Sequence, residues 1–327
     1  MSEELYEYER LEAPLDDDLI KALVAMWEDA FGGSFHWIED ELKRHPGVIK
    51  NVIYLVRNKQ QIVSTCRLSM RCSVPYVGML GEVLTLEEHR GRGLAKNLCS
   101  MATDEFDQNH GQALFLATGN PAAAKLYSNL GWRHLPKTAA MLRVGEGENE
   151  DFFVNYFEQG KKLSVRICCG GSNYQHTIVP LILVPHDLAL LDWNTSLLST
   201  KYFIQSSCEG LYPRYKELET TGAWFVLKRS DNVIVGLASV KYQNNGVYSV
   251  DAFAHSDYQQ NWLKLLYQGA IAWAYDNGAQ SIQAFCAEQD EFKKYVLEDS
   301  SFEMTENTKL FEYAGVKLKT FLFKHVQ

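Results

Sequence analysis

The chain has 327 residues, of which 46% are hydrophobic and 22% are charged, and its formal net charge is −9. This composition is typical of a globular protein, and the length predicts about two domains. The negative charge argues against a nucleic-acid partner, because phosphate binding needs clustered lysine and arginine, and it favours a cationic substrate such as an amine.

The sequence also indicates a compartment. No stretch approaches the roughly 20 uninterrupted apolar residues that cross a bilayer, and the acidic N-terminal residues do not form a secretory signal, so we expect no membrane partner. The seven cysteines include no Cys-x-x-Cys pair. We therefore expect neither a disulfide framework nor a metal site, and a reducing, cytoplasmic environment.

The first half alternates between helix and strand patterns. Apolar residues recur at helical spacing behind an acidic turn and predict a helix over 16–31. Further elements are expected in this order: strands over 51–57, 61–71 and 77–86, a helix over 94–110, a strand over 113–118, a helix over 121–130 and a strand over 138–144. A polar run at 145–150 predicts the boundary between a first domain over 1–145, a linker over 146–175 and a second domain over 176–327.

The second half repeats this plan. Its patterns predict a strand over 177–184, a helix over 187–198, a hairpin over 224–229 and 233–242, a strand over 247–254, a helix over 262–275 and a strand over 281–286. When Asp251 is aligned with Glu82, Leu263 falls on Leu94. This agreement suggests a tandem duplication.

A glycine-rich segment joins a predicted strand to a predicted helix, with the sequence Arg90-Gly91-Arg92-Gly93-Leu94-Ala95. The N–H groups and dipole of a helix N-terminus can hold a pyrophosphate, and glycine lets the backbone approach it without a Cβ. The alternative is an ordinary turn with two solvated arginines. The segment lacks the Gly-Lys-Ser/Thr ending of a P-loop, and Lys96 stands where a dinucleotide fingerprint needs a third small residue.

A second motif runs from Asn120 to Trp132. Asn120 is a good N-cap, and Pro121 and Gly131 suit the start and the end of a helix. Tyr127 lies on the same helical face as small and apolar residues, so one interpretation is a half-buried core tyrosine.

Together these motifs resemble the GNAT superfamily of N-acetyltransferases. The resemblance is carried by a strand, Arg-x-x-Gly-x-Ala, a helix, a strand and then Asn-x-x-Ala-x-x-x-Tyr-x-x-x-Gly-Trp, and it covers about 51–144. The second half resembles the fold alone. The resemblance implies an α/β fold of two tandem GNAT-like domains, each with a mixed, mostly antiparallel sheet flanked by helices.

The resemblance also implies a cosubstrate, acetyl-CoA, with no metal. The strand before the loop is splayed in this family, so Val83 and Thr85 would expose backbone groups to the pantetheine arm. Asn120 would bind a pantetheine amide, and Ala123 is small enough to admit it. The residues that would cradle the pyrophosphate are Arg90, Gly91, Arg92, Gly93, Leu94 and Ala95.

The implied reaction needs an acid and a base. A free amine attacks the thioester directly, and Tyr127 would be the general acid that protonates the leaving thiolate. Glu82 is the candidate base for the acceptor's ammonium, the alternative being a solvated or salt-bridged strand glutamate. Lesser candidates are His36, His134 and Glu28.

The second half has lost the loop. Gln259-Gln260-Asn261-Trp262 stands in place of the glycine segment, and the indole of Trp262 at the position of Gly93 would block a pyrophosphate. Tyr295 falls near the place of Tyr127, but no glycine follows it at the family's spacing, so we interpret it as structural. We expect a catalytic first domain and a degenerate second one.

Two questions stay open at this point. The rival interpretation is a non-catalytic acyl-CoA-binding or regulatory module, which intact Tyr127 disfavours. The acceptor can be a small amine, an amino acid, an aminoglycoside or a protein N-terminus, and an oligomer is possible.

Overall fold

The computed structural model describes residues 6–45, 47–145, 151–202, 208 and 210–326. The chain divides into two compact units, one of Met1–His134 with Ala140–Asn149 and one of Leu135–Ala139 with Glu150–Gln327. Within the described residues, no helix has the length and apolar character needed to span a membrane.

The first unit is built on one sheet, whose described strands number seven in the order β1-β2-β3-β4-β5-β7-β6. Among these strands only β4 and β5 run parallel to each other. The strands are β1 (Tyr6–Glu12), β2 (Ile49–Asn58), β3 (Gln61–Arg71), β4 (Val77–Thr85), β5 (Ala113–Ala117), β6 (Arg133–His134) and β7 (Ala140–Val144).

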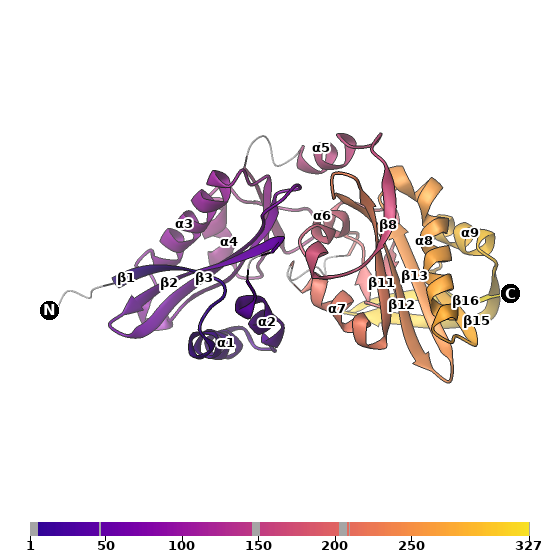
Figure 1. Ribbon diagram of the computed structural model, residues 1–327, viewed down its shortest axis with the longest axis horizontal. Coiled ribbons are helices and arrows are strands. Elements are labelled where there is room, and N and C mark those ends of the chain that lie inside the picture. Colours follow the sequence, from indigo (N-terminus) through magenta and orange to yellow (C-terminus); the bar gives the residue numbers. More distant parts are fainter. Residues whose placement is uncertain (1–5, 46, 146–150, 203–207, 209, 327) are drawn as a thin grey trace. The chain divides into compact units, whose positions relative to one another are not determined.

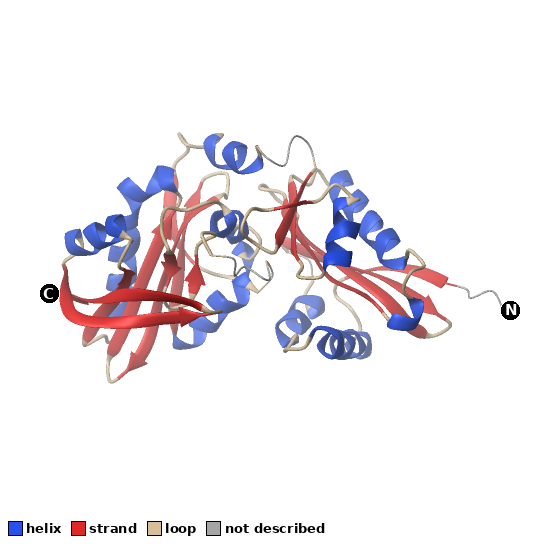
Figure 2. Ribbon diagram, turned by 180° about the vertical axis from the view of Figure 1, so that it is seen from behind, coloured by secondary structure: helices blue, strands red, loops and turns tan. Residues whose placement is uncertain are grey.

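Helices cover both faces of this sheet (Figures 1 and 2). They are α1 (Asp17–Phe31) and α2 (His36–Lys43) on one face, and α3 (Leu94–Gln108) and α4 (Pro121–Ser128) on the other; a short 3₁₀ turn, η1 (Glu87–His89), precedes α3. Because strand side chains alternate, β2 is apolar on both sides: Val52 and Tyr54 pack with α3 and α4, whereas Ile53 and Leu55 pack with α1 and α2.

The second unit is built on a sheet of the same plan, with seven described strands in the order β15-β16-β14-β13-β12-β11-β8, of which only β13 and β14 are parallel. The strands are β8 (Val165–Cys169), β11 (Gly222–Arg229), β12 (Ile234–Asn244), β13 (Val247–Ala254), β14 (Ser281–Ala287), β15 (Phe302–Tyr313) and β16 (Val316–His325). The other elements are α5 (Phe152–Glu158), η2 (Ser172–Tyr174), α6 (Ile178–Leu183), β9 (Leu190–Asp192), β10 (Leu197–Leu198), α7 (Leu211–Thr221), α8 (Ser256–Asp276) and α9 (Glu291–Asp299).

The predicted fold class is confirmed, since both units are mixed, mostly antiparallel sheets flanked by helices. The helix predicted over 16–31 is α1, and Asp16 is its N-cap because its side chain accepts from the N–H groups of Asp18 and Leu19. The strands and helices predicted between 51 and 144 all occur, whereas β1, α2 and β6 had not been predicted.

Two predictions in the second half were wrong. Residues 177–184 form α6 rather than a strand, and 187–198 contain β9 and β10 rather than a helix. Every residue of Ile178–Leu183 is buried, and a short run that is apolar on all sides has no period that separates helix from strand. The helix predicted over 262–275 begins earlier, at Ser256. The range expected as a linker contains α5 and β8, and β8 pairs with β11.

Candidate active site

The candidate site of the first unit begins where two parallel strands separate. β4 and β5 pair from Val77–Met79 to Ala113–Phe115, and no later pair joins them, although β4 continues to Thr85 and β5 to Ala117. Strands that diverge leave backbone N–H and C=O groups without partners in the sheet. The side of β4 that faces β5 can therefore bind an extended ligand.

A bulge in β4 accompanies this separation. Thr65 pairs with Leu84 and Arg67 with Gly81, so two residues of β4 face one residue of β3. The bulge contains Glu82, whose φ of 47° is in the left-handed region. This conformation re-aims the strand at the point where it leaves β5.

Hydrogen bonds from the α1 side hold the bulge in place. Trp27 Nε1 donates to Thr65 Oγ1 over 3.0 Å, and Thr65 Oγ1 donates to the carbonyl oxygen of Glu82 over 2.7 Å. The Leu86 N–H donates to Val63 on β3 over 2.9 Å. Because backbone groups alternate along a strand, those of Val83 and Thr85 point the other way, towards β5. Both residues are half-buried.

The glycine segment lies at the N-terminus of α3 as its sequence predicted. Gly91 and Gly93 have φ of 77° and 79°, and a Cβ on either residue would meet nothing within 4 Å. Gly93 is the N-cap and no side chain caps the helix. The first-turn N–H groups, which include those of Leu94 and Ala95, therefore have no side-chain cap, and the positive end of the helix dipole lies at this end of α3.

Two guanidinium groups flank this helix end. Arg90 Nε donates to the carbonyl oxygen of Thr85 over 3.0 Å, and Arg92 donates to that of Glu88 over 3.4 Å. Arg92 also lies 5.7 Å from the ring centroid of Tyr6 on β1. The unpaired N–H groups, the space beside both glycines and these cations fit a pyrophosphate.

The start of α4 provides the second predicted contact. Asn120 Oδ1 accepts from the N–H groups of Ala122 and Ala123 over 2.9 and 3.4 Å, which makes it the N-cap. Its Nδ2 has no partner among the described residues and is exposed. Ala123 is half-buried on the same turn. A free amide donor and a small side chain thus adjoin the end of β5.

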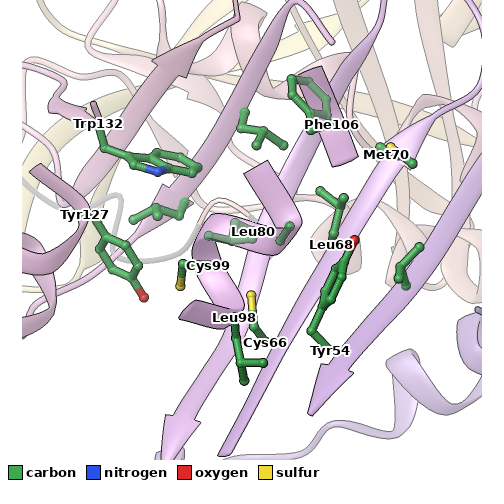
Figure 3. Close-up of a cluster of buried hydrophobic side chains, with 14 of the residues drawn as sticks. Tyr54, Cys66, Leu68, Met70, Leu80, Leu98, Cys99, Phe106, Tyr127 and Trp132 are labelled. Carbon is green, nitrogen blue, oxygen red and sulfur yellow. The ribbon is translucent and has the colours of Figure 1, made fainter. Parts of the chain in front are cut away.

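Tyr127 of α4 is buried in the apolar cluster between α3, α4 and the sheet. Its side chain is 6% exposed, and its ring lies 6.1 Å from that of Trp132. Figure 3 shows its hydroxyl pointing away from the indole. No hydrogen bond to this hydroxyl occurs within the described residues. Burial raises the pKa of Tyr127, and Cys99 raises it further, so the phenol keeps its proton.

Glu82 lies in a buried ion pair. Its Oε2 is 2.5 Å from Arg67 Nε, and the side chains are 6% and 2% exposed. Arg67 Nη1 also donates to Asn51 Oδ1 over 2.9 Å, and its guanidinium lies 5.7 Å from the ring centroid of Trp37. In this structure Glu82 is therefore a salt-bridged strand glutamate, which was the alternative to a free base.

The structure does not bring the three lesser candidates together with these groups. His36 is exposed and lies 2.8 Å from Glu39, which raises the pKa of His36. Glu28 accepts from the N–H of Phe35, and His134 is exposed in β6. Among the described residues, none of the three is bonded to Glu82 or Tyr127, and no group of three or more His, Cys, Asp and Glu side chains could hold a metal ion.

Arg67, Asn51 and Tyr6 had not been predicted as site residues. An arginine inside a strand as apolar as β3 is a signal of a buried partner, because charged side chains are almost never fully buried unless paired. Tyr6 gives no such signal, since its contact with Arg92 depends on the pairing of β1 with β2.

Comparison with known proteins gives one family match. Residues 59–141 match the family model described as FR47-like protein, which is GNAT-like. This range contains the bulge of β4, the glycine segment and α4. No curated protein matches the sequence.

Several solved structures are similar to about half of the chain. A ribosomal-protein-alanine N-acetyltransferase from Brucella melitensis is 12% identical with a TM-score of 0.39, over 50% of this chain and 99% of that one. A GNAT-family acetyltransferase from Streptococcus pneumoniae is 15% identical with a TM-score of 0.38, over 49% and 98%. A Salmonella typhimurium protein described as an acetyltransferase and solved with its cofactor acetyl-CoA is 17% identical with a TM-score of 0.37, over 49% and 92%.

Proposed function

We propose that the first unit of this chain is a GNAT-like acyltransferase domain that transfers an acetyl group from acetyl-CoA to a primary amine. The observation that carries the proposal is the separation of β4 from β5 beside an uncapped, glycine-led helix N-terminus. We assign the transfer to residues 1–145 and no transfer to 176–327.

Coenzyme binding would use three groups of residues. The segment Arg90–Ala95 would hold the pyrophosphate through its N–H groups and guanidinium groups. The backbone of Val83 and Thr85 would bind the pantetheine arm as a neighbouring strand does. Asn120 would donate from Nδ2 to an amide oxygen of that arm, and Ala123 leaves room for it.

The chemistry would be direct attack by the amine. Acetyl-CoA, when bound, supplies a thioester. Backbone N–H groups of the separated part of β4 would stabilise negative charge on the attacked carbonyl oxygen. Tyr127 would donate its proton to the departing sulfur, and its hydroxyl, which has no hydrogen-bond partner among the described residues, supports this role.

Glu82 would accept the proton of the acceptor's ammonium, directly or through water. Arg67 contacts Oε2, so Oε1 is the atom left for this transfer. The same ion pair supports a structural role, because it fixes the bulge that separates β4 from β5. In both roles Glu82 acts from the bulge of β4, beside the place where the acceptor would meet the thioester.

One observation favours a second candidate function, a non-catalytic acyl-CoA-binding module. Tyr127 and Glu82 are both buried, at 6% and 9% exposure, and Glu82 is paired. A binder needs only the loop, the separated strands and Asn120. Intact Tyr127 at the family's position supports the enzyme.

The two functions are distinguished by turnover. Purified full-length protein is incubated with acetyl-CoA and a panel of polyamines, amino acids, aminoglycosides and peptides, and free thiol is measured. The enzyme releases thiol in proportion to an acetylated acceptor, in many turnovers per chain. A protein that binds acetyl-CoA with a measurable Kd but gives no acceptor-dependent thiol above a Tyr127→Phe control would be the binder.

A further inference from the structure

The second unit contains the same separation of parallel strands as the first. β13 and β14 pair only from Val247–Ser249 to Ser281–Gln283, although β13 continues to Ala254 and β14 to Ala287. In the first unit the corresponding gap is the proposed coenzyme cleft. In the second unit the chain's own segment 189–193 lies there, and its first four residues are 1% exposed or less.

Carboxylates on both sides bind the backbone of this segment. Asp290, the N-cap of α9, accepts from the N–H groups of Ala189 and Leu190 over 2.7 and 3.1 Å. On the β13 side, Asp251 Oδ2 accepts from the N–H of Trp193 over 2.7 Å. The Trp193 ring stacks on Phe285 of β14, with centroids 4.0 Å apart. The segment therefore bridges the two separated strands.

A buried lysine binds the carbonyl groups of the same segment. Lys293 Nζ donates to the carbonyl oxygens of Leu190 and Leu191, each over 3.1 Å, and lies 2.6 Å from Asp251 Oδ1. Both charged side chains of this ion pair are 0% exposed. A ligand entering here would have to break a buried ion pair and expel peptide groups that are already hydrogen-bonded.

The residues that bind the segment stand at the positions proposed to bind coenzyme in the first unit. To compare the two units, we align α4 with α9 from their N-caps, Asn120 and Asp290. We align β4 with β13 through Glu82 and Asp251. The helix pairs are Asn120 with Asp290, Ala123 with Lys293 and Tyr127 with Leu297. The long side chain of Lys293 thus stands where the small Ala123 would leave room for coenzyme in the first unit. Leu297 stands where Tyr127 does and has no hydroxyl that could donate a proton. Tyr295, which the sequence placed near Tyr127, is 63% exposed.

The strand positions agree with this comparison. Ala252 occupies the place of Val83, and its N–H donates to Asp251 Oδ1 over 2.7 Å. The backbone donor that would face coenzyme in the first unit is therefore satisfied by an internal carboxylate in the second.

The pyrophosphate end of the cleft is closed as well. α8 begins at Ser256, directly after β13, so the residues aligned with the glycine segment are helical. His255 caps this helix by accepting from the N–H of Asp257, and Phe157 stacks on the His255 ring with centroids 4.2 Å apart. The start of α8, all of it within the described residues, therefore offers no glycine-lined helix end for an anion.

We infer that the segment Ala189–Trp193 is a permanent internal ligand of the second unit, bound in the cleft between β13 and β14 in place of a coenzyme. The cleft recognises an extended chain of amide groups through Asp290, Lys293 and Asp251, and its own chain supplies that ligand. The inference concerns the second unit alone, so it stands or falls independently of the proposed function of the first.

Hydrogen exchange of the full-length protein, read by mass spectrometry, tests the internal ligand. The N–H groups of Ala189, Leu190 and Trp193 should exchange as slowly as those of β13, both without and with saturating acetyl-CoA, and calorimetry should show at most one acetyl-CoA per chain. Exchange at the rate of an unstructured peptide, faster exchange when acetyl-CoA is added, or a second bound equivalent would overturn the inference. If no acetyl-CoA binds at all, the proposed function fails while slow exchange still supports the internal ligand.

A variant locates the contact. Asp290→Asn keeps the side-chain shape, but its single, uncharged amide oxygen can accept only one of the two hydrogen bonds, so the exchange of Ala189 and Leu190 should rise by about tenfold or more. Glu291→Gln is the matched control, because its side chain is 80% exposed and pairs with Lys294 rather than with the segment. Equal exchange in Asp290→Asn and the control would contradict the assignment. The wild-type measurement decides the question if Asp290→Asn does not fold.

Discussion

Arg67 and Glu82 form an ion pair inside the first unit, with Arg67 Nε 2.5 Å from Glu82 Oε2. Arg67 comes from β3 and Glu82 from the bulge of β4, so the pair joins the two strands at the point where β4 leaves β5. Asn51 of β2 binds the same guanidinium. Three neighbouring strands thus hold the residue whose left-handed backbone opens the candidate cleft.

Arg67→Met should destabilise the first unit strongly. Loss of the guanidinium leaves the Glu82 carboxylate buried without its partner, which typically costs about 3–5 kcal/mol of unfolding free energy. Arg57→Met is a matched control on the neighbouring strand β2, because Arg57 pairs with Glu9 at 25% and 33% exposure and such pairs contribute about 0–1 kcal/mol. Urea denaturation measures both. Equal losses of unfolding free energy in the two variants would show that the buried pair contributes no more to stability than the exposed one.

Gly93→Trp should abolish coenzyme binding while the fold survives. The variant places in the first unit the indole that the second carries at Trp262, and the ring would enter the space where the pyrophosphate is proposed to lie. A left-handed non-glycine residue costs about 1–2 kcal/mol, so most of the stability should remain.

Gly33→Trp controls for that backbone strain. Gly33 has a φ of 84° and nothing within 4 Å of a Cβ, like Gly93, but it lies between α1 and α2. Calorimetry with acetyl-CoA should give an unchanged Kd for Gly33→Trp and no binding for Gly93→Trp. An unchanged Kd in both would refute the placement of the pyrophosphate.

Glu82→Gln tests the proposed base. Removing a general base should lower kcat by about 10²–10⁴-fold at neutral pH, where the acceptor is an ammonium. The deficit should shrink as the pH approaches about 10, because the acceptor then loses its proton without help. Glu28→Gln is the control, since Glu28 binds the Phe35 N–H and not the bulge. A deficit in kcat that stays constant with pH would show that Glu82 has a structural role alone.

Glu105 of α3 makes the stability of the first unit depend on pH. Hydrogen bonds from Arg10, Tyr54 and Lys50 lower the pKa of Glu105 to about 2, with Arg10 the largest cause. A carboxyl group whose folded pKa is below its unfolded value stabilises the fold above the unfolded pKa, near 4.5, and loses that contribution as the pH falls towards 2. Acid unfolding should therefore begin within this window.

Glu105→Gln should be less stable than the wild type at pH 7 by about 1–2 kcal/mol, and the difference should vanish between pH 4.5 and pH 2. Asp104→Asn, on the exposed side of the same helix, should change stability by less than about 0.5 kcal/mol. Unfolding free energies measured by urea across this range check both variants. A loss of unfolding free energy in Glu105→Gln that persists at pH 2 would show that the ionised Glu105 carboxylate is not its cause.

Local patterns were enough to predict most of the first unit. The helix α1 follows from the spacing of Leu19, Leu23 and Trp27 and from the Asp16 cap, and the glycine segment from its position between a strand and a helix. These elements have one apolar face or a distinct terminus, so the residues themselves carry the information.

Contacts between distant segments could not be predicted. The strand β1 is an edge strand with alternating tyrosine and charged residues, and it exists because it pairs with β2. In the second unit, the alignment of Asp251 with Glu82 agrees with the strand order, but nothing in the sequence shows that Lys293 lies 2.6 Å from Asp251. Buried charges of this kind are defined by their partners, and the partners are set by the fold.

The central claim, that the first unit is a transferase with Tyr127 as general acid, is tested most directly by Tyr127→Phe, with kcat and melting temperature measured on one preparation. The variant keeps the ring that packs on Trp132 and removes the hydroxyl, which has no hydrogen-bond partner among the described residues. Tyr54→Phe is the matched control, since its hydroxyl donates to Glu105 and its loss should cost about 0.5–1.5 kcal/mol of stability without slowing the folded molecules. The account predicts that Tyr127→Phe melts as the wild type does and releases thiol about 10²–10⁴-fold more slowly, with acceptor KM little changed. A Tyr127→Phe protein that turns over at the wild-type rate would contradict it.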